Sequence, residues 1–149
     1  MAERKFFVFS LSEKDEAFDH KDMKKATKWL EDKQYEPNPV CYFRENSPRE
    51  VPSGAIILFS FDAKLFGQAT LKGTKKAVPQ EVQEDRRKAG EIVYKYFVHL
   101  EPTKENIIIF SNPRSKKEIT KKVGITFNRV FTYLSHSEYQ KILKLVRKR

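Results

Sequence analysis

The chain has 149 residues, which is enough for one domain with a hydrophobic core of its own. Its single cysteine excludes an internal disulfide and a metal cluster built on cysteines, and no apolar run is long enough for a signal peptide or a membrane span. We therefore expect a cytoplasmic protein in a reducing compartment.

The net charge of +10 is concentrated near the C-terminus. Residues 114–149 contain eleven lysines and arginines and two glutamates, and so carry +9 of the total. Clustered basic residues predict binding to a polyanion such as nucleic acid, because they release condensed counterions from phosphates. A solvated basic tail and a basic protein-interaction domain remain as alternatives.

The first third of the chain predicts a strand, a helix and a short second strand. Residues 5–11 (KFFVFSL) favour a strand. Residues 22–34 have helical composition, with Asp22 as the N-cap and Trp29, the only tryptophan, beside the apolar face. That face is formed by residues three and four positions apart: Met23, Ala26 and Leu30. Two prolines end the helix, and residues 41–43 predict a short strand.

Residues 54–73 form the centre of the predicted fold. Two apolar runs, 56–61 and 65–71, are separated by the short polar break of residues 62–64, which is typical of a hairpin. The first run is almost continuously apolar, so both faces of that strand should be covered. The second alternates, which predicts two faces: Leu65, Gly67, Ala69 and Leu71 on one, Phe66, Gln68 and Thr70 on the other. The glycine at position 67 indicates a bulge or a close approach by another group.

The next segment predicts one helix, two strands and a loop. Residues 79–88 begin with a proline and are followed by Gly90, which is typical of a helix. Residues 92–100 and 106–110 predict strands rich in aromatic and β-branched residues. Residues 111–124 predict a basic loop with room for one helical turn.

The C-terminal part predicts a last strand at residues 126–133 and a helix that opens with the capping box of Ser135 and Glu138. The apolar face of that helix is Tyr139, Ile142, Leu143 and Val146. Six or so strands with two or three helices indicate an α+β fold, with a strongly curved sheet or small β-barrel in a single domain over residues 1–149. The chain is expected to be the N-terminal module of a longer protein, and a natural C-terminal end is the equal alternative.

No catalytic motif is present. The segment around Gly73, Thr74 and Lys75 lacks the glycine spacing of a P-loop, and Cys41 lies in no recognisable motif. The histidines are isolated from one another: His20, His99 and His136. We therefore expect that the domain itself is no enzyme and needs neither a metal nor a cofactor.

Three segments taken together resemble the YTH domain, which belongs with the EVE and ASCH domains in the PUA-like superfamily. They are the first strand (KFFVFS), the helix with Trp29, and the hairpin IILFSF with FGQA. Ser111-Asn112-Pro113 is similar to the family's NP turn after a late strand. The resemblance spans about residues 5 to 146 and implies a PUA-like curved sheet.

The resemblance implies that the domain reads a modified base, N6-methyladenine, in an aromatic pocket. Similar domains at the N-terminus of McrBC-type, modification-dependent restriction enzymes read methylated DNA, so methylated DNA with a flipped base is the leading expectation, with a fused motor or nuclease as a partner. The alternatives are a YTH-like RNA reader and an ASCH-type enzyme that acts on a nucleoside. A flipped base suits an apolar, π-faced slot, and a basic surface offsets the cost of extrusion.

The resemblance implies two sets of site residues, one for a modified-base pocket and one for phosphate binding. The modified-base pocket would contain Trp29, Ser10, Leu11, Ser12, Phe61 and Tyr94. The phosphate-binding residues would be Arg114, Lys116, Lys117, Lys121, Lys122 and Arg129. The family's second cage tryptophan has no counterpart here, which leaves the second wall and the identity of the modification open. Trp29 as a plain core residue is also an open alternative.

Overall fold

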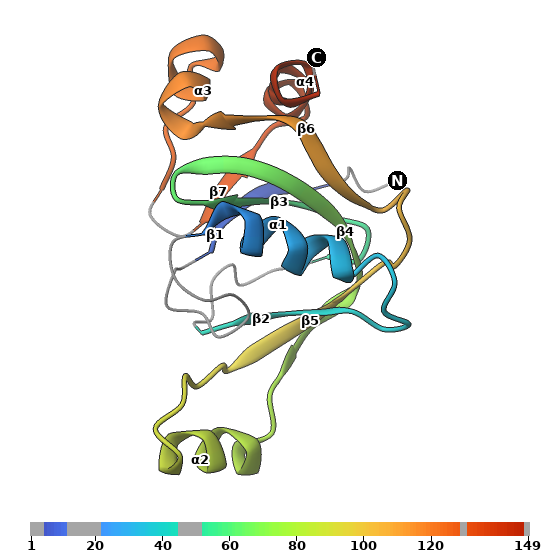
Figure 1. Ribbon diagram of the computed structural model, residues 1–149, viewed down its shortest axis with the longest axis vertical. Helices are drawn as coiled ribbons and strands as arrows, with labels where there is room; N and C mark the ends of the chain where they lie inside the picture. The colour runs from blue at the N-terminus through green and yellow to red at the C-terminus, as the bar shows by residue number, and fades with distance from the viewer. Residues whose placement is uncertain (1–4, 12–21, 45–51, 129–130, 148–149) are drawn as a thin grey trace.

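The computed structural model describes residues 5–11, 22–44, 52–128 and 131–147. Within these residues the chain forms seven strands and four helices (Figure 1). The strands are β1 (Phe6–Ser10), β2 (Val40–Phe43), β3 (Ile56–Phe61), β4 (Lys64–Ala77), β5 (Tyr96–Leu100), β6 (Ile107–Ser115) and β7 (Phe131–Leu134). The helices are α1 (Met23–Asp32), α2 (Gln80–Lys88), α3 (Lys116–Val123) and α4 (His136–Val146).

All seven strands belong to one sheet in the order β2-β5-β4-β3-β1-β7, with β6 paired to β4. β1 and β3 are parallel, and the other pairs are antiparallel. β2 and β7 lie at opposite ends of this path and do not pair with each other among the described residues, so the sheet is open. The predicted α+β class with a curved sheet is therefore confirmed, in its open form rather than as a barrel.

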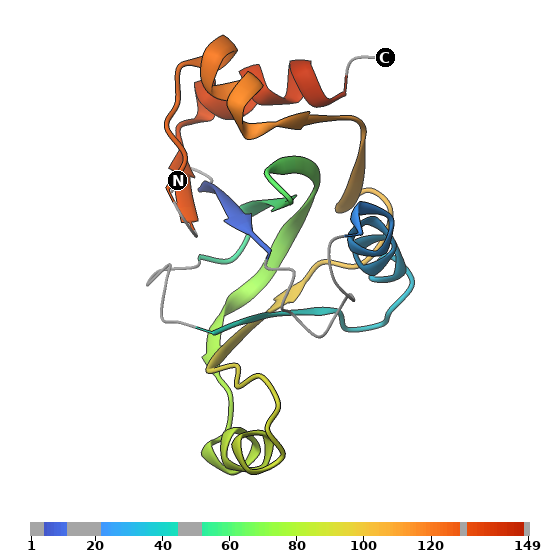
Figure 2. The same cartoon turned by 60° about the vertical axis from the view of Figure 1, so that its left-hand side comes forward.

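β4 connects the two halves of the sheet. Its first half pairs with β3 and β6, and its second half, from Leu71 to Ala77, pairs with β5. The strand bends strongly between these halves (Figure 2). The hairpin turn is formed by Asp62 and Ala63, which both have positive φ, as a two-residue turn requires. β4 is longer than the predicted run of residues 65–71, because β5 offers a pairing partner that only the folded chain brings near.

Gly67 lies next to a bulge, which corrects the predicted alternation. Phe59 pairs with Gly67 and Ser60 pairs with Leu65, so Phe66 has no partner on β3. The extra residue turns Leu65 to the opposite face, while Phe66 packs on the same side as Ala69 and Leu71. The close approach expected at Gly67 is confirmed, since an added Cβ would lie 2.4 Å from the Leu30 side chain and 2.8 Å from the Ile108 carbonyl oxygen.

The sheet buries apolar side chains on both faces. On one face, α1 contributes Ala26 and Leu30 to a core that includes Phe7, Phe59 and residues of β2 and β5; we call it the α1-side core. On the other, α3 and α4 cover a second core, which we call the α3/α4-side core, with Phe6, Val8, Leu58, Ile119 and Ile142. Both faces of β3 are buried, as predicted. Figures 1 and 2 show α3 and α4 together at one end of the molecule and α2 at the opposite end.

The predicted boundaries are wrong in the segment between α2 and α3. The strand expected over residues 92–100 begins only at Tyr96, and the strand expected over 106–110 continues to Ser115. The continuation pairs with β4, where Ser115 lies opposite Lys64 and Arg114 opposite Leu65. Pro113 is tolerated because it lies in an irregular stretch of the strand that has no register partner on β4.

The predicted basic loop at 111–124 is therefore the end of β6 followed by the full helix α3. Ser115 caps α3 by accepting a hydrogen bond from the Glu118 amide, and Gly124 ends it with a left-handed conformation. Similarly, Ser111-Asn112-Pro113 lies within a strand and forms no turn. None of the helices in the described ranges is both long and apolar enough to cross a membrane.

Candidate nucleic-acid interface

The C-terminal end of β1 carries a cluster of polar groups on the α3/α4 side of the sheet. Ser10 lies opposite Ser60 of β3, and their hydroxyl oxygens are 3.2 Å apart. The ammonium group of Lys116 donates a hydrogen bond to the Ser10 hydroxyl at 2.5 Å. The same ammonium lies 5.5 Å from the centre of the Phe127 ring. We call Ser10, Ser60, Lys116 and Phe127 the β1-end cluster.

The backbone fixes Lys116 at this place. Its amide donates to the carbonyl of Ala63 in the β3–β4 turn at 2.8 Å, so the start of α3 is tied to the hairpin. Burial lowers the pKa of the Lys116 side chain, because the charged form loses hydration there. A cation that is partly desolvated and held by a hydroxyl can bind an anion such as phosphate more strongly than a fully hydrated lysine can.

Two further pocket residues, Leu11 and Trp29, lie on the other side of the sheet. Along β1, Phe7 and Phe9 face the α1-side core, and Leu11 continues that face, whereas Ser10 faces α3. Leu11 and Trp29 are partly buried against the α1-side core. The structure thus brings Ser10 together with Lys116, on the face of the sheet opposite Leu11 and Trp29.

Trp29 is packed but not enclosed. Its ring meets Phe59 edge to face, with centroids 5.5 Å apart. The ammonium of Lys33, which also pairs with Glu36 at 3.9 Å, lies 4.8 Å from the ring centre. Trp29 therefore has a core contact and is only partly buried, and its role in a base pocket stays a prediction.

The other two described pocket residues have different surroundings. Phe61 is only 2% exposed and belongs to the α1-side core. Tyr94 lies outside the strands and contacts Tyr42 of β2, with ring centroids 5.4 Å apart, while the Arg86 guanidinium lies 5.6 Å from its ring. Ser12, the last residue of the predicted pocket, lies outside the described residues.

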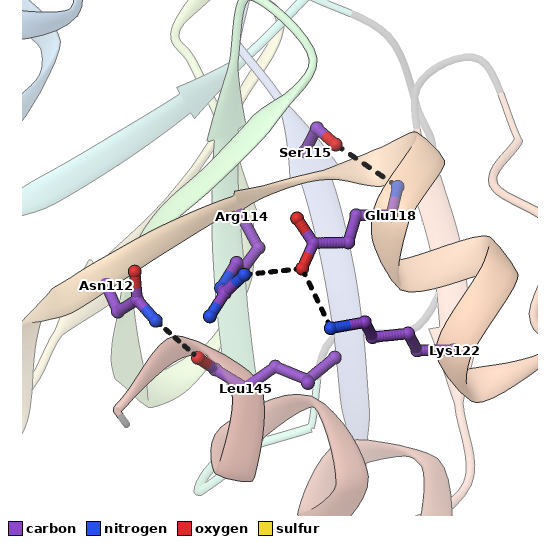
Figure 3. Close-up of polar contacts among 6 residues, drawn as sticks. All are labelled: Asn112, Arg114, Ser115, Glu118, Lys122 and Leu145. Atoms are coloured by element: carbon purple, nitrogen blue, oxygen red, sulfur yellow. Dashed lines mark hydrogen bonds and ion pairs between the residues drawn. The ribbon is translucent and has the colours of Figure 1, made fainter. Parts of the chain in front are cut away.

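The predicted phosphate-binding residues divide into two groups. Arg114 and Lys122 both pair with Glu118, at 2.5 and 3.3 Å, and Asn112 donates to the Leu145 carbonyl nearby (Figure 3). This network ties β6, α3 and α4 together and partly neutralises those two cations. Lys117 and Lys121 are exposed on α3 instead. Arg129 lies outside the described residues.

Sequence reasoning missed two members of the β1-end cluster, Ser60 and Phe127. Ser60 is the only polar residue in the run 56–61. A polar residue in a buried apolar strand needs a hydrogen-bond partner, so the sequence does contain a signal for Ser60. No sequence pattern marks Phe127, because its contact with Lys116 exists only once α3, which separates the two residues in the chain, has folded. The exposed aromatic residue Tyr42 on β2 was also missed as a functional candidate.

Comparisons with known proteins give a fold. No family model matches the chain, and no curated protein matches its sequence. Its structure is similar to ASCH from Zymomonas mobilis, with a TM-score of 0.59 and 15% identity over 96% of each chain. It is also similar to the YTH domain of the Zygosaccharomyces rouxii MRB1 protein, solved in complex with N6-methyladenosine RNA, with a TM-score of 0.54 and 13% identity over 97% of this chain and 88% of that one. The chain therefore has the fold shared by ASCH and YTH domains, as the sequence resemblance predicted.

Proposed function

We propose that the chain binds nucleic acid and holds an extruded N6-methyladenine near the end of β1, with methylated DNA as the first substrate to test. The observation that carries this proposal is the 2.5 Å contact between Lys116 and Ser10. It places a cation suited to a phosphate at the end of β1, so the backbone would lie on the α3/α4 side there, while the extruded base would pass the end of the strand to reach Trp29 on the other face. We further propose that the domain acts by binding alone, as the recognition module of a modification-dependent restriction system with a motor or nuclease as partner.

The charge distribution supports the energetics of such binding. Extruding a base from a duplex costs about a few kcal/mol. The segment that contains Lys116 carries +9, and Lys117 and Lys121 are exposed on the same helix. Phosphate contacts by these residues would release counterions and offset the extrusion cost. Because phosphate contacts carry no sequence information, they would fix the strand while the base site gives the selectivity.

In this proposal Trp29 forms the aromatic wall for the base. Trp29 is only partly buried, and Phe59 packs against its ring edge to face. Lys33 lies over the ring, so its side chain must turn aside when a base stacks there. A methylated exocyclic amine is weakly hydrated, which favours its transfer to an apolar, aromatic surface.

The proposal is tested by fluorescence anisotropy at fixed salt. The probes are a matched DNA duplex and a single-stranded RNA, each with and without one N6-methyladenine. We expect tighter binding to the methylated duplex than to the plain one. Equal affinities for the methylated and plain forms of both probes would refute a methyladenine reader.

Replacing Trp29 by Ala should remove the preference for the methylated probe and weaken its binding by about five- to 100-fold, the range expected when one aromatic–base stack is lost. Trp29→Phe keeps an aromatic ring and should retain most of the preference. Urea unfolding of both variants separates this effect from a loss of stability. A folded Trp29→Ala protein with its preference intact would remove Trp29 from the site.

The second candidate is an RNA reader, and one observation favours it. The YTH domain with this fold was solved with N6-methyladenosine RNA. A preference for the methylated RNA probe over the methylated duplex would establish this alternative. An ASCH-type enzyme acting on a nucleoside is the third candidate; incubation of the protein with modified nucleosides and chromatography of the products would detect any turnover.

A further inference from the structure

The half of the sheet formed by β2, β5 and the end of β4 has a second surface that the proposed function does not use. Cys41 and Val98 are an opposed pair that faces the α1-side core. Side chains alternate along a strand, so the neighbouring pairs Tyr42–Phe97 and Val40–His99 point to the other side. On β4, Lys76 lies opposite Phe97 and Lys72 lies opposite His99. We call these six residues the outer face: Val40, Tyr42, Phe97, His99, Lys72 and Lys76.

Aromatic rings form a continuous row across this surface. Tyr94 contacts Tyr42 at 5.4 Å between centroids, Tyr42 contacts Phe97 at 6.1 Å, and Phe97 contacts His99 at 5.5 Å. Tyr42 is 47% exposed, which is unusual for an aromatic residue in a strand whose neighbours are buried. Among the described residues, the main helix contacts with the sheet are made by α1, α3 and α4 on β4, β6 and β7, not on β2 or β5. Tyr42 is thus the exposed member of the row, and Tyr94, Phe97 and His99 are partly buried beside it.

Basic residues flank the row at both ends. Lys72 and Lys76 are exposed at its β4 edge. Arg86 lies over Tyr94 at its other end, where it also pairs with Glu91 at 3.4 Å. Strands β2 and β5 and residues 71–77 contain no aspartate or glutamate. The surface is therefore complementary to a polyanion that also carries flat, apolar groups.

We propose that the outer face binds single-stranded nucleic acid, with bases stacked on Tyr42 and Phe97 and phosphates on Lys72 and Lys76. Unpaired bases stack on aromatic side chains with little sequence preference, while a basic edge follows the backbone. Paired bases are already stacked within a duplex and offer no face to these rings. The surface would thus hold the strand that flanks a target site, independently of any modified base.

The test uses a fluorescent strand of about twelve thymidines, a length within the usual range of single-strand sites. This probe contains no adenine, so the result is separate from the base-reader proposal. We expect Tyr42→Ala to weaken its binding at least about fivefold, the low end for loss of one stacked base. Tyr42→Trp, which keeps a stacking surface, should bind like the wild type. Lys72→Gln with Lys76→Gln should weaken binding and flatten its dependence on salt.

The matched control is Tyr133→Ala, since Tyr133 is 57% exposed on β7 at the other end of the sheet. It should leave the affinity unchanged, and thermal melting should show that all variants fold. Photo-crosslinking with a strand containing 5-iodouridine should label a peptide containing Tyr42 or Phe97.

Three results would overturn the proposal. The first is no binding of the thymidine strand by the wild-type protein, or equal binding by the Tyr42→Ala and Tyr133→Ala variants. The second is displacement of the strand by polyglutamate of equal charge with the same dependence on Tyr42, which would indicate an acidic protein partner. The third is a dimer in sedimentation that Tyr42→Ala dissociates, which would make the outer face an interface between two copies of the chain.

Discussion

Gly67 shows how one residue without a side chain holds two layers together. A Cβ at this position would overlap with the Leu30 side chain of α1 and the Ile108 carbonyl of β6. We expect Gly67→Ala to destabilise the fold by about 1 to 3 kcal/mol, the usual cost of overpacking a dense core. Urea unfolding would measure the change as a lower midpoint with an unchanged slope.

A double-mutant cycle with Leu30→Ala tests the cause. If the clash with Leu30 dominates, Gly67→Ala should cost less when Leu30 is already shortened. Strict additivity of the two changes would instead assign the cost to the Ile108 carbonyl, which neither change moves.

Lys116 should make the stability of the protein depend on alkaline pH. Burial lowers its pKa below the ordinary 10.5, so between the lowered value and 10.5 the unfolded chain binds this proton and the native chain does not. The free energy of unfolding contributed by Lys116 therefore rises as the pH increases through that window. We expect wild type to gain stability relative to Lys116→Met between about pH 7 and about pH 10, measured by urea unfolding.

Lys116→Arg provides the control, because arginine does not titrate in this range. Its stability relative to Lys116→Met should not change with pH. A wild-type difference that is equally flat would mean that the ammonium keeps its ordinary proton affinity beside Ser10.

Among the elements, α4 depends on its capping box. The Ser135 hydroxyl accepts from the Glu138 amide, and the Glu138 carboxylate accepts from the Ser135 amide. This start fixes the register that buries Tyr139, Ile142 and Val146. Ser135→Ala should lower the free energy of unfolding by about 1 kcal/mol. The exposed Ser137, two residues further on, gives the control: Ser137→Ala should be neutral or slightly stabilising in urea unfolding, because alanine favours a helix.

The starts of α4 and α3 together show what the sequence can and cannot predict. Ser135 and Glu138 open α4, which was predicted with its apolar face, although the strand before it begins at Phe131 and not at residue 126 as expected. Ser115 and Glu118 form the same pattern and Gly124 follows, yet the prediction for residues 111–124 was a basic loop with one helical turn and not the full helix α3. The local signal was present at α3, but the strand that leads into it exists only because β4 pairs with Arg114 and Ser115.

The candidate site was predictable to a lesser degree than the fold. Strand and helix periodicity gave both cores, since burial repeats along each element. The contact between Ser10 and Lys116 spans 106 positions in the sequence and depends on the β3–β4 turn that holds α3. Contacts between residues so far apart in the sequence depend on the topology of the sheet, so no local sequence pattern predicts them.

At the scale of the whole molecule, the positive charge is segregated. Residues 114–149 hold +9, and α3 and α4 lie together at the end opposite α2 (Figure 1). A duplex held there should lose affinity steeply with salt, with a slope of about 0.9 for each phosphate neutralised. Arg114 and Lys122 share Glu118, so Lys117 and Lys121 should carry more of this dependence than their neighbours.

Replacing Lys117 and Lys121 by glutamine should reduce the salt slope by up to about 1.8 and weaken methylated and plain duplexes equally. The control removes the same charge elsewhere, at the exposed Lys24 of α1 and Lys88 of α2. Anisotropy titrations across a salt series should show an almost unchanged slope for that control. If both double variants flatten the slope alike, the duplex responds to total charge and not to the α3 end. An unchanged slope in both would mean that the phosphates lie on another surface, and the outer face of β2 and β5 would be the first to examine.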